Sequence, residues 1–245
     1  MKSFEYLIFF LIFCIFGTAS AQELTIFVDN WPPYNFKKDD KIVGISTELI
    51  EAALKKADYR YKLLIYPFKR ALVSVQRTPN TMLYTVARIP QRENMFEWIG
   101  PLHPRKVNLY KLKYRTDIQI NNVEDIKRYT TGVLLGGSVE QFFITNGFQK
   151  NQYLLLPHAK LLIKILFKKR VDFIPGDPLD LAYQMKNLGY KFSELENAYL
   201  LSEKGGYYMI ANKGTSNEII TKLQKSLDEV LATGARDRII ERYLE

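Results

Sequence analysis

The chain has 245 residues, of which 47% are hydrophobic and 13% aromatic. This composition is typical of a folded globular protein and excludes an intrinsically disordered chain or a fibrous repeat. The 35 basic and 26 acidic residues give a net charge of +9, which alone does not indicate nucleic acid as a partner. The length allows one large domain or two small lobes, each with its own core.

Residues 1–21 are expected to be a cleaved signal peptide. Lys2 stands near the N-terminus, residues 6–16 are nearly all apolar, and residues 19–21 are the small side chains that a signal peptidase accepts. A retained membrane anchor is the alternative, but the apolar stretch is about half of the roughly 20 residues that a spanning helix needs. We therefore expect the mature, exported protein to begin at Gln22.

The mature chain offers few groups for metal or redox chemistry. The full sequence has one cysteine, Cys14, which lies in the predicted signal peptide. The mature protein therefore has no disulfide, no thiolate metal site and no thiol catalysis. The two histidines, His103 and His158, occur in unrelated segments and indicate neither a metal cluster nor a Ser-His-Asp arrangement. Walker and dinucleotide glycine motifs are absent as well. We expect no metal and no cofactor.

The first part of the mature chain alternates strand and helix signals. Short apolar, β-branched runs predict strands, and apolar residues spaced by three and four predict helices. Strands are predicted at residues 24–28, 61–66 and 82–86, and helices at residues 46–59, capped by Ser46, and 69–76. The order β-α-β-α-β favours a parallel sheet with covering helices.

A second series of the same kind follows. It predicts strands at residues 107–112, 131–135, 153–156 and 171–174, and helices at residues 138–146, 158–169 and 178–186. The C-terminal part adds a strand at 207–211 and an amphipathic helix at 216–231 that ends near Gly234. Two such series indicate two lobes, and ligands of open α/β sheets bind at the carboxyl ends of strands. The cleft between the lobes is the expected site.

Five ordered segments then carry a resemblance to a known family. They are Trp31-Pro32-Pro33-Tyr34-Asn35-Phe36 with Gly44 and Glu48-Leu49-Ile50, Pro67-Phe68-Lys69-Arg70-Ala71-Leu72, the arginine-containing segment 87–101, the glycine turn in 132–140, and Val171-Asp172-Phe173-Ile174 with Gly176-Asp177-Pro178. This set, which spans essentially the whole mature chain, resembles the bacterial extracellular solute-binding protein family 3.

The resemblance implies a two-lobed, type II periplasmic-binding-protein-like α/β fold, in which each lobe is a sheet flanked by helices and the ligand cleft lies between them. Lobe 1 is expected at residues 22–106 and 205–245, and lobe 2 at residues 107–204. The hinges are expected near residues 105–109 and 204–208. The protein would be a periplasmic monomer that binds a small molecule, an amino acid or related carboxylate, and serves an inner-membrane ABC permease. Nucleic acid is not an expected partner, and the protein is not expected to be an enzyme.

The resemblance also implies how the ligand is held. Amino-acid-binding members grip the carboxylate with an arginine of the third segment and backbone N–H groups of the fourth, and the ammonium with an aspartate of the fifth. The matching positions here are Arg92, the turn at Gly136 and Ser138, and Asp177. A guanidinium suits a carboxylate because it donates two parallel hydrogen bonds, and a helix start after a glycine turn favours an anion.

Each of these positions has a structural alternative. The alternative for Arg92 is an exposed arginine that forms a salt bridge with Glu93 or Glu97 on the surface. Ser138 is a favoured helix cap, and Asp177, which precedes a proline, has the same capping capacity for the next helix.

Five further residues are candidates for the cleft. The rings of Trp31, Tyr34 and Phe68 offer flat faces to a ligand, although aromatic residues are more often part of the core. Arg70 matches a polar cleft position of some relatives, with an exposed helix charge as the alternative. Arg88 lies four residues before Arg92 and either joins the site or packs against neighbouring acids.

Some positions depart from the family pattern. Ala87, Leu134 and Leu135 stand where many amino-acid binders carry polar residues, which predicts a more apolar pocket. Two other functions stay open. One is a ligand-sensing domain for a membrane signalling partner, and the other is a dehydratase-like periplasmic enzyme on the same scaffold, which would need a general acid in the cleft.

Overall fold

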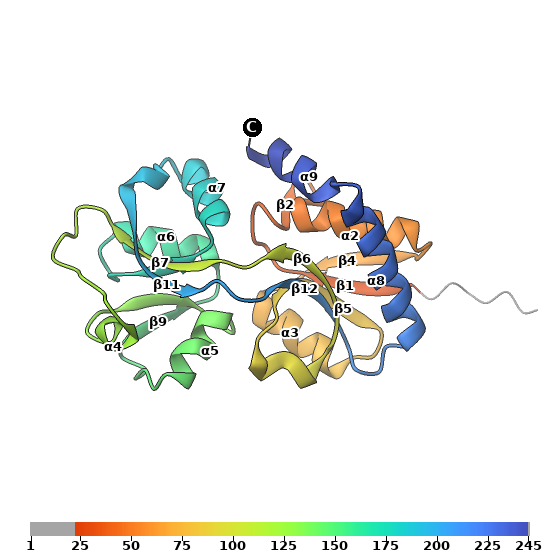
Figure 1. Ribbon diagram of the computed structural model, residues 1–245, viewed down its shortest axis with the longest axis horizontal. Helices are drawn as coiled ribbons and strands as arrows, with labels where there is room; N and C mark the ends of the chain where they lie inside the picture. Colours follow the sequence, from red (N-terminus) through yellow and green to blue (C-terminus); the bar gives the residue numbers. More distant parts are fainter. Residues whose placement is uncertain (1–22, 245) are drawn as a thin grey trace, which may run out of the picture.

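The computed structural model describes residues 23–244, so the predicted signal at residues 1–21 lies outside the described residues. Two lobes lie side by side and are joined by two extended crossings of the chain (Figure 1). This arrangement confirms the predicted two-lobed α/β fold. None of the helices within the described range is long and apolar enough to span a membrane.

Lobe 1 is formed by the two ends of the chain. Its main strands are β1 (Leu24–Val28), β4 (Tyr61–Ile65), β5 (Thr81–Ala87), β6 (Glu97–Pro104) and β12 (Gly206–Ala211). A small hairpin consists of β2 (Phe36–Lys38) and β3 (Lys41–Val43). The helices are α2 (Ile45–Lys56), α3 (Phe68–Arg77), α8 (Asn217–Ala232) and α9 (Ala235–Leu244), with a 3-10 turn η1 (Pro90–Met95).

The five-stranded sheet of lobe 1 has the order β4-β1-β5-β12-β6. Strand β1 runs parallel to β4 and β5, as predicted, but β12 is antiparallel to both β5 and β6. The parallel sheet predicted for the strands at residues 24–28, 61–66 and 82–86 is therefore confirmed, and the two antiparallel pairings of this sheet both involve β12. The reason is that β12 comes back from lobe 2 and enters between two strands that are already part of lobe 1.

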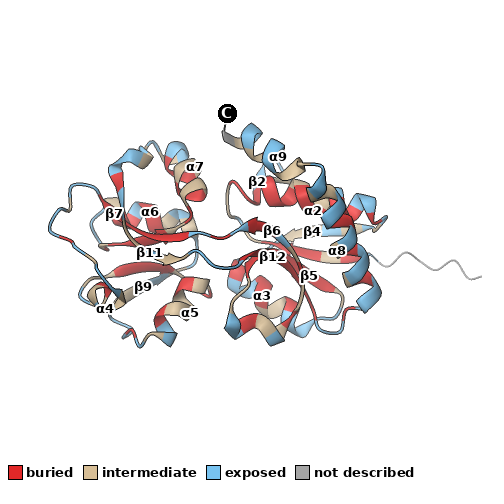
Figure 2. Cartoon of the chain, viewed as in Figure 1, coloured by how far each residue is buried: buried red, intermediate tan, exposed pale blue. Residues whose placement is uncertain are grey.

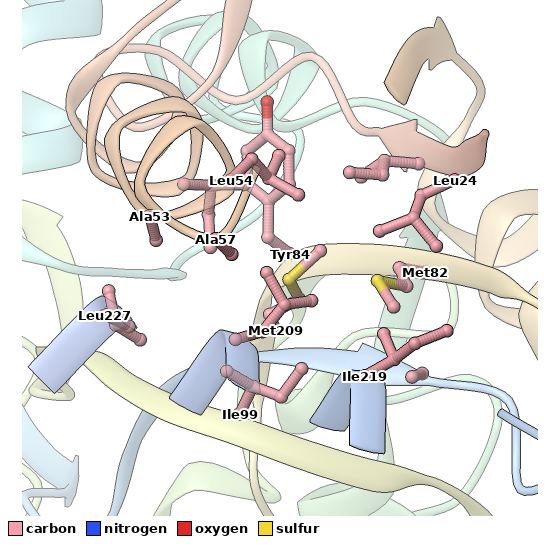
Figure 3. Packing of buried hydrophobic residues seen from close by; sticks show 14 of the residues in the cluster. Leu24, Ala53, Leu54, Ala57, Met82, Tyr84, Ile99, Met209, Ile219 and Leu227 are labelled. Atoms are coloured by element: carbon pink, nitrogen blue, oxygen red, sulfur yellow. The ribbon is translucent and has the colours of Figure 1, made fainter. Parts of the chain in front are cut away.

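The core of lobe 1 follows from the alternation of side chains along the strands. In β1, Leu24, Ile26 and Val28 face the cluster covered by α2 and α8, whereas Phe27 faces the opposite cluster, which α3 covers. Figure 3 shows Leu54 of α2 and Leu227 of α8 packed over this sheet. Helices thus cover both faces, and the buried strands form the interior of each lobe (Figure 2).

Lobe 2 is a single continuous segment of the chain. Its strands are β7 (Val107–Leu112), β8 (Thr131–Leu134), β9 (Tyr153–Leu156), β10 (Ile174–Gly176) and β11 (Leu195–Ser202). Its helices are α4 (Val123–Ile126), α5 (Ser138–Thr145), α6 (Ala159–Phe167) and α7 (Pro178–Leu188), with a 3-10 turn η2 (Phe192–Glu194). The strands form an antiparallel sheet β10-β7-β11 and a parallel pair β8-β9. Phe173 bridges to Thr131, which links the two sheets. Strand β10 covers residues 174–176, so it begins three residues later than the strand predicted at residues 171–174.

The start of α2 differs from the prediction in a way that shapes the site. The cap is Gly44 and not Ser46, whose buried hydroxyl instead lies 3.0 Å from His103 Nε2. Gly44 has a φ of 129°, and an added Cβ would lie 2.4 Å from the carbonyl oxygen of Tyr34. This close backbone approach fixes the loop of residues 31–36 against the helix start.

The two crossings lie side by side. The chain passes from β6 to β7 between Pro104 and Val107, and returns from β11 to β12 between Ser202 and Gly206. Val107 pairs with Ser202 on the lobe 2 side, and Pro104 pairs with Gly206 on the lobe 1 side. Because paired strands flank the crossings at both ends, any bending between the lobes is confined to a few residues.

Candidate functional site

A cavity of about 110 Å³ lies between the lobes and is lined by both of them. Its lobe 1 wall contains Asp29, Trp31, Phe68, Thr85, Ala87, Arg92 and Tyr207. Its lobe 2 wall contains Val107, Leu134, Gly137, Ser138, Val139, Ala159, Leu162, Pro175, Gly176, Asp177 and Asp180. Ala87 and Leu134 do line the cavity, in agreement with the predicted apolar character, while Leu135 is exposed.

The lobes are in contact, so this is a closed arrangement. The hydrogen bonds that connect lobe 1 to lobe 2 include Tyr34 Oη to Asp177 Oδ1 at 3.0 Å, Arg92 Nη2 to the Gly136 oxygen at 2.6 Å, and Gln91 Nε2 to Thr145 Oγ1 at 3.0 Å. The side chain of Lys69, at the start of α3, also lies against Gly136.

Arg92 forms the positive end of the cavity. It lies in η1, is only 4% exposed, and its guanidinium is 5.5 Å from the centre of the Phe68 ring. Nη1 donates to the Ala87 oxygen at 3.2 Å and Nη2 to the Gly136 oxygen. Since a guanidinium has five N–H donors, others are left for a ligand. Burial, followed by the charge of Arg105, lowers the Arg92 pKa to about 10, so the group stays charged at neutral pH.

The surface alternative for Arg92 is wrong. Glu93 is bound by Arg88 and Glu97 by Lys213, so neither acid pairs with Arg92. Arg88 lies instead over the rings of Trp98 and Tyr208 and is absent from the cavity lining. Of the two alternatives predicted for Arg88, packing against a neighbouring acid is therefore the one that the structure shows.

The glycine turn leads into the start of α5 beside Arg92. Gly137 is the N-cap residue and no side chain caps the helix, so the first N–H groups of α5 have no intrahelical acceptor. Gly137 and Ser138 line the cavity, whereas Gly136 lies behind it and its N–H donates to the Glu140 carboxylate. The capping alternative for Ser138 is wrong. Its hydroxyl accepts a hydrogen bond from Arg105 Nη2 at 2.9 Å.

Arg105 was missed by the sequence analysis. It occupies the crossing between β6 and β7, is 7% exposed, and also donates from Nη1 to Ser202 Oγ at 2.7 Å. Its guanidinium therefore joins both crossings to the start of α5. Its charge lowers the pKa of Arg92, and the charge of Glu140, which lies on the other side of the glycine turn, acts in the opposite direction. The signal available in the sequence was only its position in the expected hinge.

Asp177 lines the cavity from lobe 2. Its side chain caps α7 by accepting from the Leu179 N–H at 3.0 Å, and the same oxygen accepts from the Tyr34 hydroxyl. The capping alternative and a position in the cavity therefore both hold. Asp177 is 8% exposed, and burial raises its pKa above the ordinary value.

Two more carboxylates that line the cavity were not predicted. Asp29 follows β1 and Asp180 lies in the first turn of α7, so they belong to different lobes. Burial raises the pKa of Asp29 to about 6 and that of Asp180 to about 7. The position of Asp29 after a strand was the one usable signal, because cleft residues gather there.

Two of the three aromatic candidates, Trp31 and Tyr34, form a cluster with Tyr207. Trp31 lines the cavity, and its ring centre lies 4.9 Å from that of Tyr34 and 5.1 Å from that of Tyr207. Tyr34 is 3% exposed and lies behind the cavity wall, where burial and the Asp177 charge raise its pKa. Phe68 lines the cavity beside Arg92.

The structure places Arg70 outside the cavity. It is exposed on α3, with its guanidinium 4.3 Å from the centre of the Tyr66 ring. The structure therefore agrees with the alternative predicted for Arg70, an exposed charge on a helix. We leave Arg70 and Arg88 out of the proposed site, because neither side chain reaches the cavity.

The architecture and the cavity between the lobes define a class by fold, the two-lobed periplasmic binding proteins. Within this class, the chain belongs to the bacterial extracellular solute-binding proteins, family 3, whose family model matches residues 24–245. The resemblance that the five sequence segments indicated is thereby confirmed.

Similar proteins are distant in sequence. A probable histidine-binding protein of Campylobacter jejuni is 26% identical over 217 residues, which cover 87% of this chain and 81% of that protein. The structure of an ancestral arginine-binding protein bound to arginine has a TM-score of 0.77 at 20% identity, over 91% of this chain and 98% of that one. A histidine kinase sensor domain with similarity to periplasmic binding proteins has a TM-score of 0.79 at 14% identity, over 91% and 96%. At these identities the structural likenesses establish the fold.

Proposed function

We propose that this protein is a periplasmic receptor that captures a small solute by closing its lobes and delivers it to an inner-membrane ABC importer. The solute is an amino acid or a related carboxylate. The observation that carries this proposal is the polarity of the cavity, which is positive at Arg92 and the start of α5 and negative at Asp177.

A zwitterion fits this polarity. Its carboxylate would receive hydrogen bonds from the remaining N–H groups of Arg92 and from the first turn of α5. Its ammonium would face Asp177, whose buried carboxylate is poorly solvated and gains from a partner of opposite charge. Trp31 and Phe68 would cover the apolar part of the solute.

Closure explains how binding becomes a signal to the importer. Arg92 belongs to lobe 1, whereas Asp177 and the start of α5 belong to lobe 2, so a ligand makes all its contacts only when the cleft is shut. The ligand therefore stabilises the closed form by its differential affinity for the two states. A receptor of this kind makes and breaks no covalent bond, so incubation with the solute should give no product.

The proposal is tested by a ligand screen followed by one pair of variants. Purified residues 22–245 are screened by thermal shift against amino acids, amines, di-acids and short peptides, and each hit is measured by calorimetry. Arg92→Ala should weaken carboxylate ligands at least about thirtyfold, because truncating one partner of a buried charge pair costs 2–5 kcal/mol or more. Arg88→Ala, which removes an arginine four residues away and outside the cavity, is the matched control and should leave affinity unchanged.

Circular dichroism and a melting curve show whether each variant is folded. Unchanged affinity in a folded Arg92→Ala protein, or equal losses in both variants, would contradict the assigned carboxylate site. A screen in which no amino acid or carboxylate shifts the melting temperature would contradict the proposed function itself.

A further inference from the structure

The negative end of the cavity holds more acid than one ammonium group requires. Asp29, Asp177 and Asp180 all line the cavity, against a single arginine, Arg92. The three carboxylates act on one another, since the charges of Asp177 and Asp29 both raise the pKa of Asp180. An ordinary amino acid brings one ammonium to these three groups.

No protein cation compensates this excess. Within residues 23–244, none of the three aspartates forms a salt bridge with a lysine or an arginine. Arg92 is engaged at the other end with the Gly136 oxygen, and His158 acts on Asp29 only through its charge at a distance. Nor does any cluster of His, Cys, Asp or Glu in this range have the arrangement needed to hold a metal ion.

Asp180 is built into the site more firmly than a surface acid would be. It is 5% exposed, and the amide of Gln184, one turn further along α7, donates a hydrogen bond to its carboxylate. The neutral amide thus holds this carboxylate in place at the cavity wall, which is how a charged binding group is kept oriented.

An independent observation points to a ligand in the same cavity. Thr85 lines the cavity and is 4% exposed, yet its buried hydroxyl oxygen has no hydrogen-bond partner within the described chain. Its backbone has a φ of 62°, which is unfavourable for a β-branched residue in a strand. Buried hydroxyls are rarely left unpaired, and strained residues gather at ligand sites. A ligand N–H group would supply the missing partner.

We propose that Asp180 and Asp29 form a second cation subsite, distinct from Asp177, so that the solute carries two cationic groups. This inference rests on the proposed function and specifies its ligand, a carboxylate with one ammonium for Asp177 and a second cation between Asp180 and Asp29. Thr85 accepts a hydrogen bond from one of these groups. Neutral amino acids satisfy only the first of the two cation positions.

Matched ligand pairs test this directly. Calorimetry on residues 22–245 compares arginine with citrulline and lysine with norleucine, because each pair differs mainly in the second charge. The wild type should bind the cationic member at least about tenfold more tightly. Asp180→Asn should reduce that ratio at least about tenfold while changing the affinity for citrulline and norleucine less than threefold. Asp117→Asn removes an exposed lobe 2 carboxylate and should change neither affinity.

The outcomes separate this inference from the proposed function. If citrulline and norleucine bind as tightly as arginine and lysine, or Asp180→Asn weakens all ligands equally, the second subsite is overturned and the receptor stands. If putrescine, a diamine without a carboxylate, binds as tightly as lysine, the cation subsite is supported and the carboxylate site at Arg92 is contradicted. If no member of either pair binds while another amino acid or carboxylate does, the second subsite is overturned and the receptor stands; if nothing in the screen binds, both proposals fall.

Discussion

Burial of Asp180 links the stability of the ligand-free protein to pH. Its pKa is about 7 in the folded protein and 3.8 without the fold, so between these values the folded state binds more protons than the unfolded state. Stability must then fall as the pH rises through this window. Asp29 and Asp177, whose pKa values are also raised, act in the same direction.

We expect the contribution of these aspartates to the free energy of unfolding without ligand to decrease between pH 5 and pH 7, whereas buried His103, whose pKa is lowered to about 3, acts in the opposite direction up to about pH 6.5. Asp180 alone contributes at most about 1.4 kcal/mol per pH unit. Asp180→Asn removes the titrating group and should flatten this decrease, with the largest stabilisation relative to wild type at pH 8. Urea unfolding at pH 5, 6, 7 and 8 measures both curves. Identical slopes in the two proteins would show that Asp180 does not titrate in this range.

Residue types alone identified only part of the site. Arg92, Ser138, Asp177, Trp31 and Phe68 were predicted from motif segments, and all of them line the cavity. Asp29, Thr85 and Asp180 were missed because their role depends on tertiary neighbours. In the sequence, Asp180 is an ordinary acid in a first helical turn and Thr85 an ordinary strand residue.

At the level of elements, α7 begins with a residue that has two tasks. The Asp177 carboxylate caps the helix by accepting a hydrogen bond from the Leu179 N–H. It also lines the cavity and accepts a hydrogen bond from the Tyr34 hydroxyl. Asparagine and aspartate cap helices about equally well, whereas alanine does not cap. Substitutions at this position can therefore separate the structural role from the charge.

Asp177→Asn should keep the stability within about 0.5 kcal/mol but weaken ligands that carry an amine, because only the charge is lost. Asp177→Ala should cost about 1 kcal/mol or more through the lost cap, in addition to the loss of amine binding. Chemical unfolding gives the stabilities, and calorimetry compares an amino acid with its des-amino acid. If Asp177→Asn weakens both ligands equally, the residue serves the structure and not the ammonium.

Elements with strong periodicity were predicted well, and edge elements were not. The strands at residues 24–28, 107–112 and 153–156 have the predicted bounds. Strand β6 was missed because it contains Pro101, which breaks a strand signal but is tolerated at the edge of a sheet, where β6 lies. Helix α9 was missed because its apolar face is short, although Ile239 packs on the cluster around Tyr34 and α2.

For the whole molecule, the decisive equilibrium is between open and closed lobes. The hydrogen bond from Gln91 to Thr145 joins exposed residues of the two lobes and uses no residue of the cavity lining. It exists only in the closed arrangement, so it favours closure without contacting a ligand. A ligand that needs the closed form loses affinity in proportion to any loss of that population.

Gln91→Ala should therefore raise the dissociation constants of all ligands by a common factor of about two to five, which corresponds to 0.5–1 kcal/mol for one exposed hydrogen bond. The ranking of ligands should not change. Gln76→Ala, an exposed position on α3 whose side chain has no hydrogen bond within residues 23–244, is the control. A change confined to one ligand class would place Gln91 in the binding site and contradict its role in closure.

The position of β12 in the middle of the lobe 1 sheet has a consequence for the order in which the chain can fold. Strand β6 reaches the rest of that sheet only through β12, and β12 lies within the last 40 residues of the chain. During synthesis, β1, β4 and β5 therefore emerge early and keep an unpaired edge while lobe 2, a continuous segment, acquires all its strands. Such long-range pairing is slow and exposes strand edges. Lobe 2 is thus the part of the nascent chain that can complete its sheets first, and lobe 1 closes last around its own C-terminal strand.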